Sequence, residues 1–288
     1  MKDHAFSRVT VTVLGIIGAG FLTAAPSGRG VVNGFGDTGN AYESVGRMIF
    51  IVSAPNPRGF PIGTILNSCT ITLIEPDVAL TAGHCVASSA QNGQPPWLRA
   101  VASFDRENTM DESTWIDFAG TAVHPTMPHC MGPCTFDGGD PGIQDTGLIF
   151  LANEVPRITP SKLAPRNMLQ SVERLQNIFN VNTPMAFAGY GATDYNGGDF
   201  VYSDSRRIGI MTYEGVIDAN WASWNKGPSG GCYGDSGGPV FVHVGSQQRI
   251  VATISDAGDT CAANEEETHA RADTKYVQDW IKETIAAR

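Results

Sequence analysis

A chain of 288 residues is long enough to bury a substantial core, in one large domain or in two of modest size. Its formal net charge of -10, with no basic run, argues against nucleic acid and anionic membrane surfaces as partners. Only 17% of the residues are charged, whereas 33 glycines and 17 prolines favour turns and short strands over long solvated helices.

The first 25 residues have the layout of a secretory signal peptide. Lys2 and Arg8 precede the apolar run VTVTVLGIIGAGFL, and the small residues of TAAPSG follow it. This order predicts export with cleavage near Ala24 or Ala25, although Pro26 leaves the bond itself undecided. The alternative is a signal anchor that stays in the membrane, but the run contains glycines and is shorter than the ~20 residues of a typical span. We expect a secreted protein, extracellular or periplasmic.

The cysteines are interpreted in the light of export, because disulfides form and persist in oxidising compartments. There are 6 of them, an even number that predicts three disulfides and leaves 15 possible pairings. They are Cys69, Cys85, Cys130, Cys134, Cys232 and Cys261. A structural metal site is not expected, because no CxxC pair occurs and Cys130 and Cys134 lack a second close pair. No cofactor is expected either.

From about Met48 onward, short runs of β-branched and aromatic residues recur between turn signals, which predicts an all-β sandwich or barrel. The runs are MIFIVSA, CTITLI, VALTA, GLIFLA, PMAFAGYG, RRIGIMTYEG, GPVFVHV and RIVATIS. Helical periodicity is confined to residues 166–178 and to TKYVQDWIKETIAA near the C-terminus, too little for the crossovers of a parallel α/β sheet. Long surface loops are predicted for FDRENTMDES, HPTMPHCMGPCTFDGGDPGIQ and DYNGGDF.

Three polar residues are candidates for nucleophilic chemistry. GCYGDSGGP places Ser236 among glycines, which is typical of a surface turn but also presents a hydroxyl to converging backbone N–H groups. A serine nucleophile needs a base and a third group that orients the base. His84 in LTAGHCV follows an apolar strand-like run, and Asp145 in QDTGLIFLA precedes one. Taken alone, His84 could be interpreted as a buried or solvated histidine, and Asp145 as a turn residue.

In this order, TAGHC, DTGLIFL and GDSGGP resemble the three motif blocks of the chymotrypsin/trypsin family of serine endopeptidases. The resemblance covers about residues 31–288. It implies an all-β fold of two antiparallel six-stranded β-barrels with a C-terminal helix. The first barrel is expected over 31–158 with His84 and Asp145, and the second over 159–288 with Ser236. A signal peptide at 1–25 and a short propeptide at 26–30 are expected before them.

The resemblance assigns roles residue by residue. His84 becomes the general base and then the general acid, Asp145 holds its tautomer, and Ser236 is the nucleophile that is acylated. The backbone N–H groups of Gly234 and Ser236 would form the oxyanion hole. Asp235 would receive the α-amino group that is freed when the zymogen is processed.

The activation site departs from the family pattern. VVNG, beginning at Val31, resembles the mature start of the family, which usually follows a basic residue directly. Here Gly30 stands between Arg29 and Val31, so the cut falls after Gly30 or is followed by trimming.

Family resemblance also implies the disulfides Cys69–Cys85 and Cys232–Cys261, which leaves Cys130–Cys134 by exclusion. The entropic stabilisation from a disulfide grows with the length of the loop it closes, so Cys232–Cys261 is expected to matter more to folding than Cys130–Cys134.

For the specificity pocket, the resemblance implies Gly230 as the floor, with Ser255 and Ala257 among the substrate-binding residues. No aspartate occupies the floor, so an apolar pocket that takes Phe, Tyr, Leu or Met is expected if the acids of NEEETHARAD are solvated. If Glu267 instead points inward, a preference for Lys or Arg is expected.

Two other functions are compatible with parts of the sequence. GDSGG also satisfies the nucleophile elbow of α/β-hydrolase esterases, with Asp256 or Asp259 and His269 as partners of Ser236, but TAGHC then has no role. A secreted pseudoprotease that only binds a partner is the second alternative, although all three motif residues are present. We expect protein or peptide substrates, no nucleic acid, no stable membrane association after signal cleavage, and a monomer.

Overall fold

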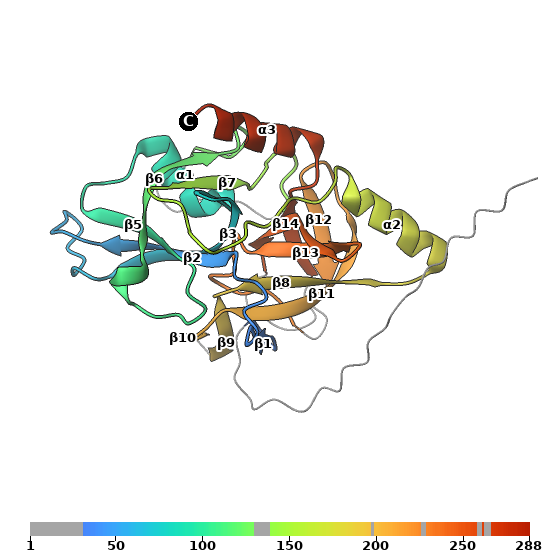
Figure 1. The fold of residues 1–288 in the computed structure, drawn as a ribbon, viewed down its shortest axis with the longest axis horizontal. Helices are drawn as coiled ribbons and strands as arrows, with labels where there is room; N and C mark the ends of the chain where they lie inside the picture. Colours follow the sequence, from blue (N-terminus) through green and yellow to red (C-terminus); the bar gives the residue numbers. More distant parts are fainter. Residues whose placement is uncertain (1–30, 130–138, 197–198, 226–228, 258–260, 262–265) are drawn as a thin grey trace, which may run out of the picture.

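The computed structural model describes residues 31–129, 139–196, 199–225, 229–257, 261 and 266–288. Two β-barrels lie side by side, with a helix across one edge of the pair (Figure 1). The predicted signal peptide and propeptide, as well as Cys130 and Cys134, lie outside the described residues.

The first barrel closes on itself through six antiparallel strands, in the order β2-β3-β4-β7-β6-β5 with β2 paired to β5. Its strands are β2 (Val45–Val52), β3 (Ile65–Glu75), β4 (Val78–Thr81), β5 (Leu98–Ser103), β6 (Ile116–Val123) and β7 (Gly147–Leu151). The side chains of Met48, Ile71, Leu73 and Ile149 are fully buried in its core. The four runs predicted as strands in this half are therefore confirmed.

The second barrel is closed by the pairing of β8 with β11, and all of its pairings are antiparallel. Its six strands are β8 (Thr183–Gly189), β11 (Arg207–Val216), β12 (Trp221–Asn225), β13 (Pro239–Val244), β14 (Gln247–Asp256) and β15 (Glu266–Arg271). A short strand near the start of the described chain, β1 (Phe35–Gly36), adds to β11. The predicted fold of two antiparallel six-stranded barrels with a C-terminal helix is confirmed.

Of the three α-helices in the described residues, the two that the sequence predicts are present as α2 (Met168–Phe179) and α3 (Lys275–Ala286). The third, α1 (Gly83–Asn92), was not predicted. The prediction of a loop at DYNGGDF was wrong, because β9 (Ala192–Asn196) pairs with β10 (Asp199–Tyr202) as a hairpin. The Gly-Gly dipeptide that stands between these strands in the sequence is itself a hairpin signal. The predicted loop FDRENTMDES contains the start of one short 3₁₀ turn, Glu112–Thr114, which ends one residue beyond it.

An apolar cluster holds the two barrels and α3 together. Leu80 and Leu148 come from the first barrel, Ile208 comes from the second, and Val277 and Ile281 come from α3. The ends of β4 and β7, which these leucines occupy, are thereby fixed against the second barrel.

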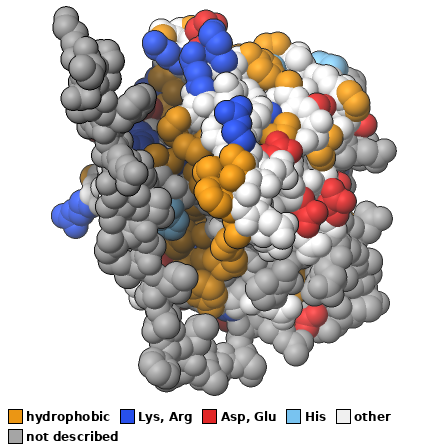
Figure 2. Space-filling view, turned by 90° about the vertical axis from the view of Figure 1, so that its right-hand side faces the viewer, with side chains coloured by type: hydrophobic (Ala, Val, Ile, Leu, Met, Phe, Trp, Pro, Cys, Tyr) orange, Lys and Arg blue, Asp and Glu red, His pale blue; other side chains and the backbone are white. Residues whose placement is uncertain are grey.

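The outer surface of α2 is unusually apolar. The helix buries Leu169 and Val172, whereas Leu175, Ile178 and Phe179 are exposed. Apolar side chains gather on this face of the molecule (Figure 2). Among the described residues, no helix has the length and apolar character needed to cross a bilayer.

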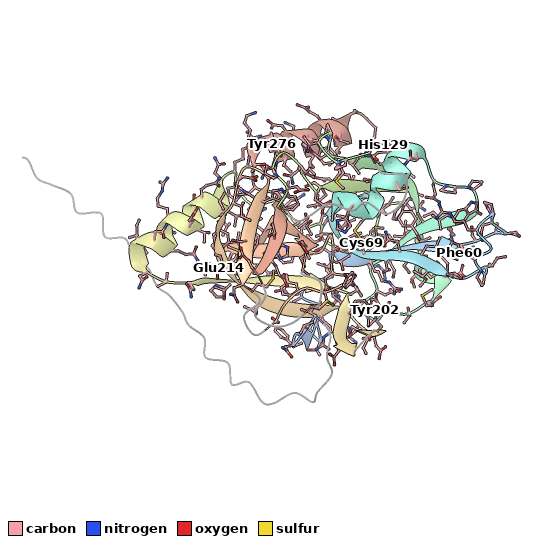
Figure 3. All side chains as sticks on the ribbon, turned by 180° about the vertical axis from the view of Figure 1, so that it is seen from behind. Phe60, Cys69, His129, Tyr202, Glu214 and Tyr276 are labelled. Atoms are coloured by element: carbon pink, nitrogen blue, oxygen red, sulfur yellow. A yellow bond between two sulfur atoms is a disulfide. The ribbon has the colours of Figure 1, made fainter. Side chains whose placement is uncertain are left out.

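His124, just after β6, packs its ring against α3. The ring centroid lies 5.1 Å from that of Tyr276 and 5.2 Å from that of Trp280, both edge to face. Figure 3 labels Tyr276 at the start of this helix. The backbone N–H of Thr126 donates to Nδ1 of His124 over 3.4 Å. Burial disfavours the charged imidazolium and lowers the pKa of His124 from 6.5 to about 4.

This burial predicts that α3 docking weakens in acid. Because the pKa of His124 is lower in the folded than in the unfolded chain, the unfolded chain takes up the proton first as pH falls. Stability that depends on neutral His124 is lost between about pH 6.5 and 4, by roughly 3 kcal/mol. In thermal unfolding, His124→Phe should lose less stability over this range than wild type. His243→Phe, at an exposed histidine of β13, is the control; a His124→Phe slope equal to wild type would contradict the account.

Candidate active site

The pairing of β4 with β7 brings His84 and Asp145 together. Thr81, the last residue of β4, is opposite Gly147, the first residue of β7. His84 follows Thr81 as the second residue of α1, and Asp145 precedes Gly147 by two positions. Two residues that are 61 positions apart in sequence therefore meet at one end of the first barrel.

Asp145 is fully buried and accepts hydrogen bonds from both barrels. Its Oδ1 accepts the backbone N–H of His84 over 2.7 Å, and its Oδ2 lies 2.8 Å from His84 Nδ1. Ser255 of β14 donates its hydroxyl to the same Oδ2 over 2.6 Å. Because an ionised carboxylate only accepts, His84 holds its proton on Nδ1, so Nε2 is the nitrogen that carries the lone pair.

The two titrating groups stabilise each other's charged forms. Burial alone lowers the pKa of His84, but the negative charge and hydrogen bond of Asp145 outweigh it, so that pKa is raised. Burial alone raises the pKa of Asp145, yet the charge and hydrogen bond of His84 and the bond from Ser255 leave it lowered. His84 is therefore a stronger base than a free imidazole, beside a carboxylate that stays ionised.

The segment that carries Ser236 lies against the segment that carries His84. The Ser236 carbonyl accepts the N–H of Thr70 in β3 over 2.9 Å, and Cys85 Sγ lies 3.8 Å from the same oxygen. Cys85, the neighbour of His84, is joined to Cys69 by a disulfide. Figure 3 labels Cys69, whose side chain is buried in the core of the first barrel. Ser236, in the turn before β13, is partly exposed.

The backbone around Ser236 is held so that its N–H groups have fixed directions. Gly234 has a φ of +96°, and a Cβ there would lie 3.0 Å from Gly191 Cα, so only glycine fits without strain. The carbonyl of Tyr233 accepts the Ala192 N–H over 2.7 Å. The carbonyl of Asp235 accepts the Gly238 N–H over 2.8 Å. Because N–H and C=O point in opposite directions across a trans peptide, these bonds orient the N–H groups of residues 234 and 236.

The carboxylate of Asp235 is fully buried beneath this loop. It accepts the backbone N–H of Gly191 over 2.8 Å and that of Cys232 over 3.0 Å. Burial, with a smaller contribution from the negative charge of Glu267, raises the pKa of Asp235 to about 7. Among the described residues, no cationic side chain forms an ion pair with it. A positive group placed beside Asp235 would therefore be strongly stabilised.

Val31 is fully buried in the same barrel, where it packs with Phe187. Its neighbour Val32 accepts the N–H of Gly230 through its carbonyl over 3.2 Å. The start of the described chain is thus inserted next to the predicted floor of the specificity pocket.

The expectation that the acids of NEEETHARAD are solvated is wrong for Glu267. In β15, Glu266 is exposed and Glu267 is fully buried, as the alternation of a strand requires. The backbone N–H of Gly231 donates to Glu267 Oε1 over 2.7 Å, which compensates for the burial of that oxygen. Glu265 lies outside the described residues.

Glu267 has a buried histidine as its neighbour. His269 Nε2 lies 2.9 Å from Glu267 Oε2, and the ring of His269 stacks at 5.1 Å from that of Trp224. The backbone N–H of Ser255 donates to His269 Nδ1 over 3.3 Å, so neutral His269 carries its proton on Nε2. His269 thus lies against Glu267 and Ser255, whereas the histidine in contact with Asp145 is His84. The two-barrel fold also excludes the α/β-hydrolase alternative.

The other predicted pocket residues adjoin Gly231. A Cβ on Gly231 would meet Ala257 Cβ and Glu267 Oε2, each at 3.4 Å. Gly230 is buried and Ala257 is partly exposed. Ser255, predicted to bind substrate, also donates to Asp145, a contact for which the sequence carried no signal.

Two of the three predicted disulfides are confirmed, Cys69–Cys85 and Cys232–Cys261. The predicted Cys130–Cys134 bond lies outside the described residues. Potential metal-binding atoms of Cys69, His84 and Cys85 lie within 4.8 Å of one another, but both sulfurs are joined in a disulfide and so are not thiolates.

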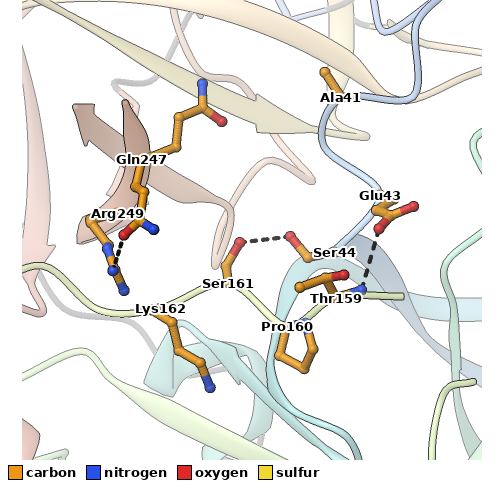
Figure 4. A pocket seen from close by; sticks show the side chains of 10 residues that line it. Ala41, Glu43, Ser44, Thr159, Pro160, Ser161, Lys162, Gln247 and Arg249 are labelled. Carbon is orange, nitrogen blue, oxygen red and sulfur yellow. Dashed lines mark hydrogen bonds between the residues drawn. The ribbon is translucent and has the colours of Figure 1, made fainter. Parts of the chain in front are cut away.

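A separate open pocket lies where the segment between the barrels passes the turn from β13 to β14 (Figure 4). Ser44 and Ser161 share a hydrogen bond of 2.8 Å within it, and Thr159 donates its N–H to Glu43 over 3.3 Å. It includes none of the residues that surround Asp145.

Comparison with known proteins gives consistent results. The trypsin family model matches residues 52–281. Human chymotrypsin-like elastase family member 3B is 25% identical over 240 residues, which cover 78% of this chain and 81% of that protein. Trypsin eta of Drosophila erecta is 22% identical over 285 residues, which cover 96% of this chain and 97% of that protein.

The electrostatics of the His84–Asp145 pair can be tested directly. Asp145→Asn removes the charge that raises the pKa of His84, so this pKa should fall. Asp256→Asn removes an exposed carboxylate with a smaller influence, so the fall should be smaller. Titration of the His84 imidazole by NMR measures both. A shift in Asp256→Asn as large as that in Asp145→Asn would contradict the assignment.

Proposed function

The chain belongs to the trypsin family, and on this basis we propose that it is a secreted serine endopeptidase that cuts peptide bonds through an acyl-enzyme intermediate. The observation that carries the proposal is the pair of hydrogen bonds between Asp145 and His84, next to the loop that contains Ser236. Family membership supplies the reaction class, and this geometry supplies residues with the required properties.

In the proposed mechanism, Ser236 Oγ attacks the carbonyl carbon of the scissile bond while His84 Nε2 takes its proton. His84 then gives that proton to the departing amine. In the second half of the reaction, a water molecule attacks the acyl-enzyme while His84 takes its proton, and His84 returns a proton to Ser236 Oγ as the acyl group is released. Asp145 keeps His84 in the tautomer with Nδ1 protonated and stabilises the imidazolium that forms.

The proposed oxyanion hole consists of the N–H groups of Gly234 and Ser236. Negative charge develops on the carbonyl oxygen of the substrate as Ser236 attacks. Backbone donors that are already oriented stabilise this charge without reorganisation, and the loss of one donor in such a site costs ~10²–10³ in kcat. The tied carbonyls of Tyr233 and Asp235 support this assignment.

For activation, we propose that cleavage before Val31 frees an α-amino group that pairs with Asp235. Val31 is already buried in the second barrel, and Asp235 is a buried carboxylate whose pKa of about 7 reflects burial. An ammonium group beside it would favour its ionised form and lower that pKa. The propeptide would then be residues 26–30 and the signal peptide residues 1–25, followed by the proposed barrel regions 31–158 and 159–288.

For specificity, we propose a preference for Lys or Arg before the scissile bond, in place of the expected apolar preference. The buried carboxylate of Glu267 lies behind Gly231, next to Ala257 and Gly230. A substrate cation in the pocket would be attracted to this buried carboxylate, because Coulomb attraction is stronger where water is excluded, whereas an apolar side chain would gain nothing from it. We further propose protein or peptide substrates, no cofactor, and a monomeric enzyme without membrane association.

The triad is tested by substitution in the processed chain. Ser236→Ala and His84→Ala should each abolish peptidase activity and labelling by a fluorophosphonate probe, because labelling needs an activated serine. Both variants should keep the thermal stability of a folded chain. Activity retained by Ser236→Ala, or lost in His269→Ala and not in His84→Ala, would refute the assignment. Activity retained by Ser236→Ala would point to a different nucleophile, whereas a wild type without activity and without probe labelling would point to a pseudoprotease.

The specificity is tested with a peptide library and the processed enzyme. Wild type should cleave after Lys and Arg, and Glu267→Gln should lose at least 10-fold of this preference, because the buried charge is gone. Glu266→Gln, at the exposed neighbour, is the matched control and should leave the profile unchanged. Cleavage after Phe or Leu that does not respond to Glu267→Gln would overturn the proposal.

A further inference from the structure

Thr70, in the first barrel, holds the loop of Ser236 in the second barrel. It lies in β3 and is fully buried. Its backbone N–H donates to the carbonyl of Ser236 over 2.9 Å. Its hydroxyl donates to the carbonyl of Gly234 over 2.8 Å. One residue therefore binds the chain on both sides of Asp235.

The direction of the hydroxyl hydrogen bond follows from its other partner. The backbone N–H of Tyr190 donates to Thr70 Oγ1 over 3.2 Å, and an N–H has no acceptor role. The carbonyl of Gly234 can only accept, so the single hydroxyl proton of Thr70 is directed at it. A β-branched side chain has few χ1 rotamers, which keeps this geometry fixed.

The peptide held by Thr70 lies between the two that carry the proposed oxyanion donors. The N–H of Gly234 belongs to the peptide before it and the N–H of Ser236 to the peptide after it. Gly234 has a φ of +96°, and glycine adopts many conformations with similar ease. Local sterics therefore do not hold this peptide. If it were not held, the link between the two donor peptides would loosen, and these would depend only on the bonds from Ala192 to Tyr233 and from Gly238 to Asp235.

We propose that Thr70 is a positioning residue for the oxyanion hole, acting through its hydrogen bond to the Gly234 carbonyl. This inference rests on the proposed peptidase function. The side chain does not touch the reacting atoms; it keeps the donors aimed at the developing negative charge. Its effect should therefore appear in the transition state and not in substrate binding.

The chain offers a matched control at Thr72. Thr72 lies two residues further along β3 and is also buried, but its hydroxyl makes no hydrogen bond in the part of the chain that the structure describes. Thr72→Val and Thr70→Val thus each remove one buried hydroxyl from β3. Only Thr70→Val breaks a hydrogen bond to the loop of Ser236.

The kinetic experiment compares four processed enzymes: wild type, Thr70→Val, Thr70→Ser and Thr72→Val. Thr70→Val should lower kcat about 10-fold or more, with KM within about twofold, since the loss of an entire donor costs ~10²–10³. Its affinity for a peptidyl trifluoromethyl ketone, which forms a tetrahedral adduct with the serine, should fall in parallel. Thr70→Ser keeps the hydroxyl and should recover most of kcat, and Thr72→Val should match wild type. If Thr70→Val does not fold, Thr70→Ala takes its place in the comparison.

A second measurement does not depend on activity. In a Ser236→Ala background, amide hydrogen exchange in residues 232–238 should be faster with Thr70→Val than with Thr72→Val. Equal exchange in the two variants, or a kcat of Thr70→Val within twofold of wild type, would overturn the proposal. Failure of the proposed function is distinguishable, because wild type itself would then cleave no peptide and form no adduct at Ser236, while the exchange comparison would still decide whether Thr70 holds the loop.

Discussion

The carboxylate of Asp145 is a buried negative charge that the two barrels share. His84 of the first barrel contributes two donors to it, and Ser255 of the second contributes a third. An unpaired buried carboxylate costs several kcal/mol, so all three bonds matter to stability, and the bond from Ser255 constrains how the barrels meet. The base is therefore not an isolated side chain at the end of a helix. Its orientation is part of the contact that joins the two halves of the molecule.

The same junction orders the serine loop. The Gly234 and Ser236 carbonyls are bound by Thr70 from the first barrel, whereas Asp235 is bound by Gly191 and Cys232 within the second. The loop thus depends on both barrels. Any change in their relative position would disturb the proposed base and the proposed oxyanion donors together, so the apolar cluster with α3 is expected to matter to the proposed chemistry as well as to stability.

The sequence predicted eight of the twelve barrel strands and the motif blocks because these are local patterns, but it missed β5, β6, β12 and β15. It did not predict α1, whose residues GHCVASSAQN show no clear apolar stripe and which begins directly after β4. Nor did it predict that Glu267 turns inward while Glu266 is exposed, because strand phase is set by the pairing of Glu267 with Trp224. The contacts of Ser255 with Asp145 and of Thr70 with Gly234 join residues more than 100 positions apart and follow only from tertiary packing.

The central claim is that Ser236 is a nucleophile activated by His84 and served by two backbone donors. It is tested most directly by a crystal structure of the processed protein after reaction with a peptidyl phosphonate. The account predicts phosphorus bonded to Ser236 Oγ, with one phosphonate oxygen within hydrogen-bond distance of the N–H groups of Gly234 and Ser236. Phosphorus on another residue, or an oxygen directed away from the Gly234 N–H, would contradict it.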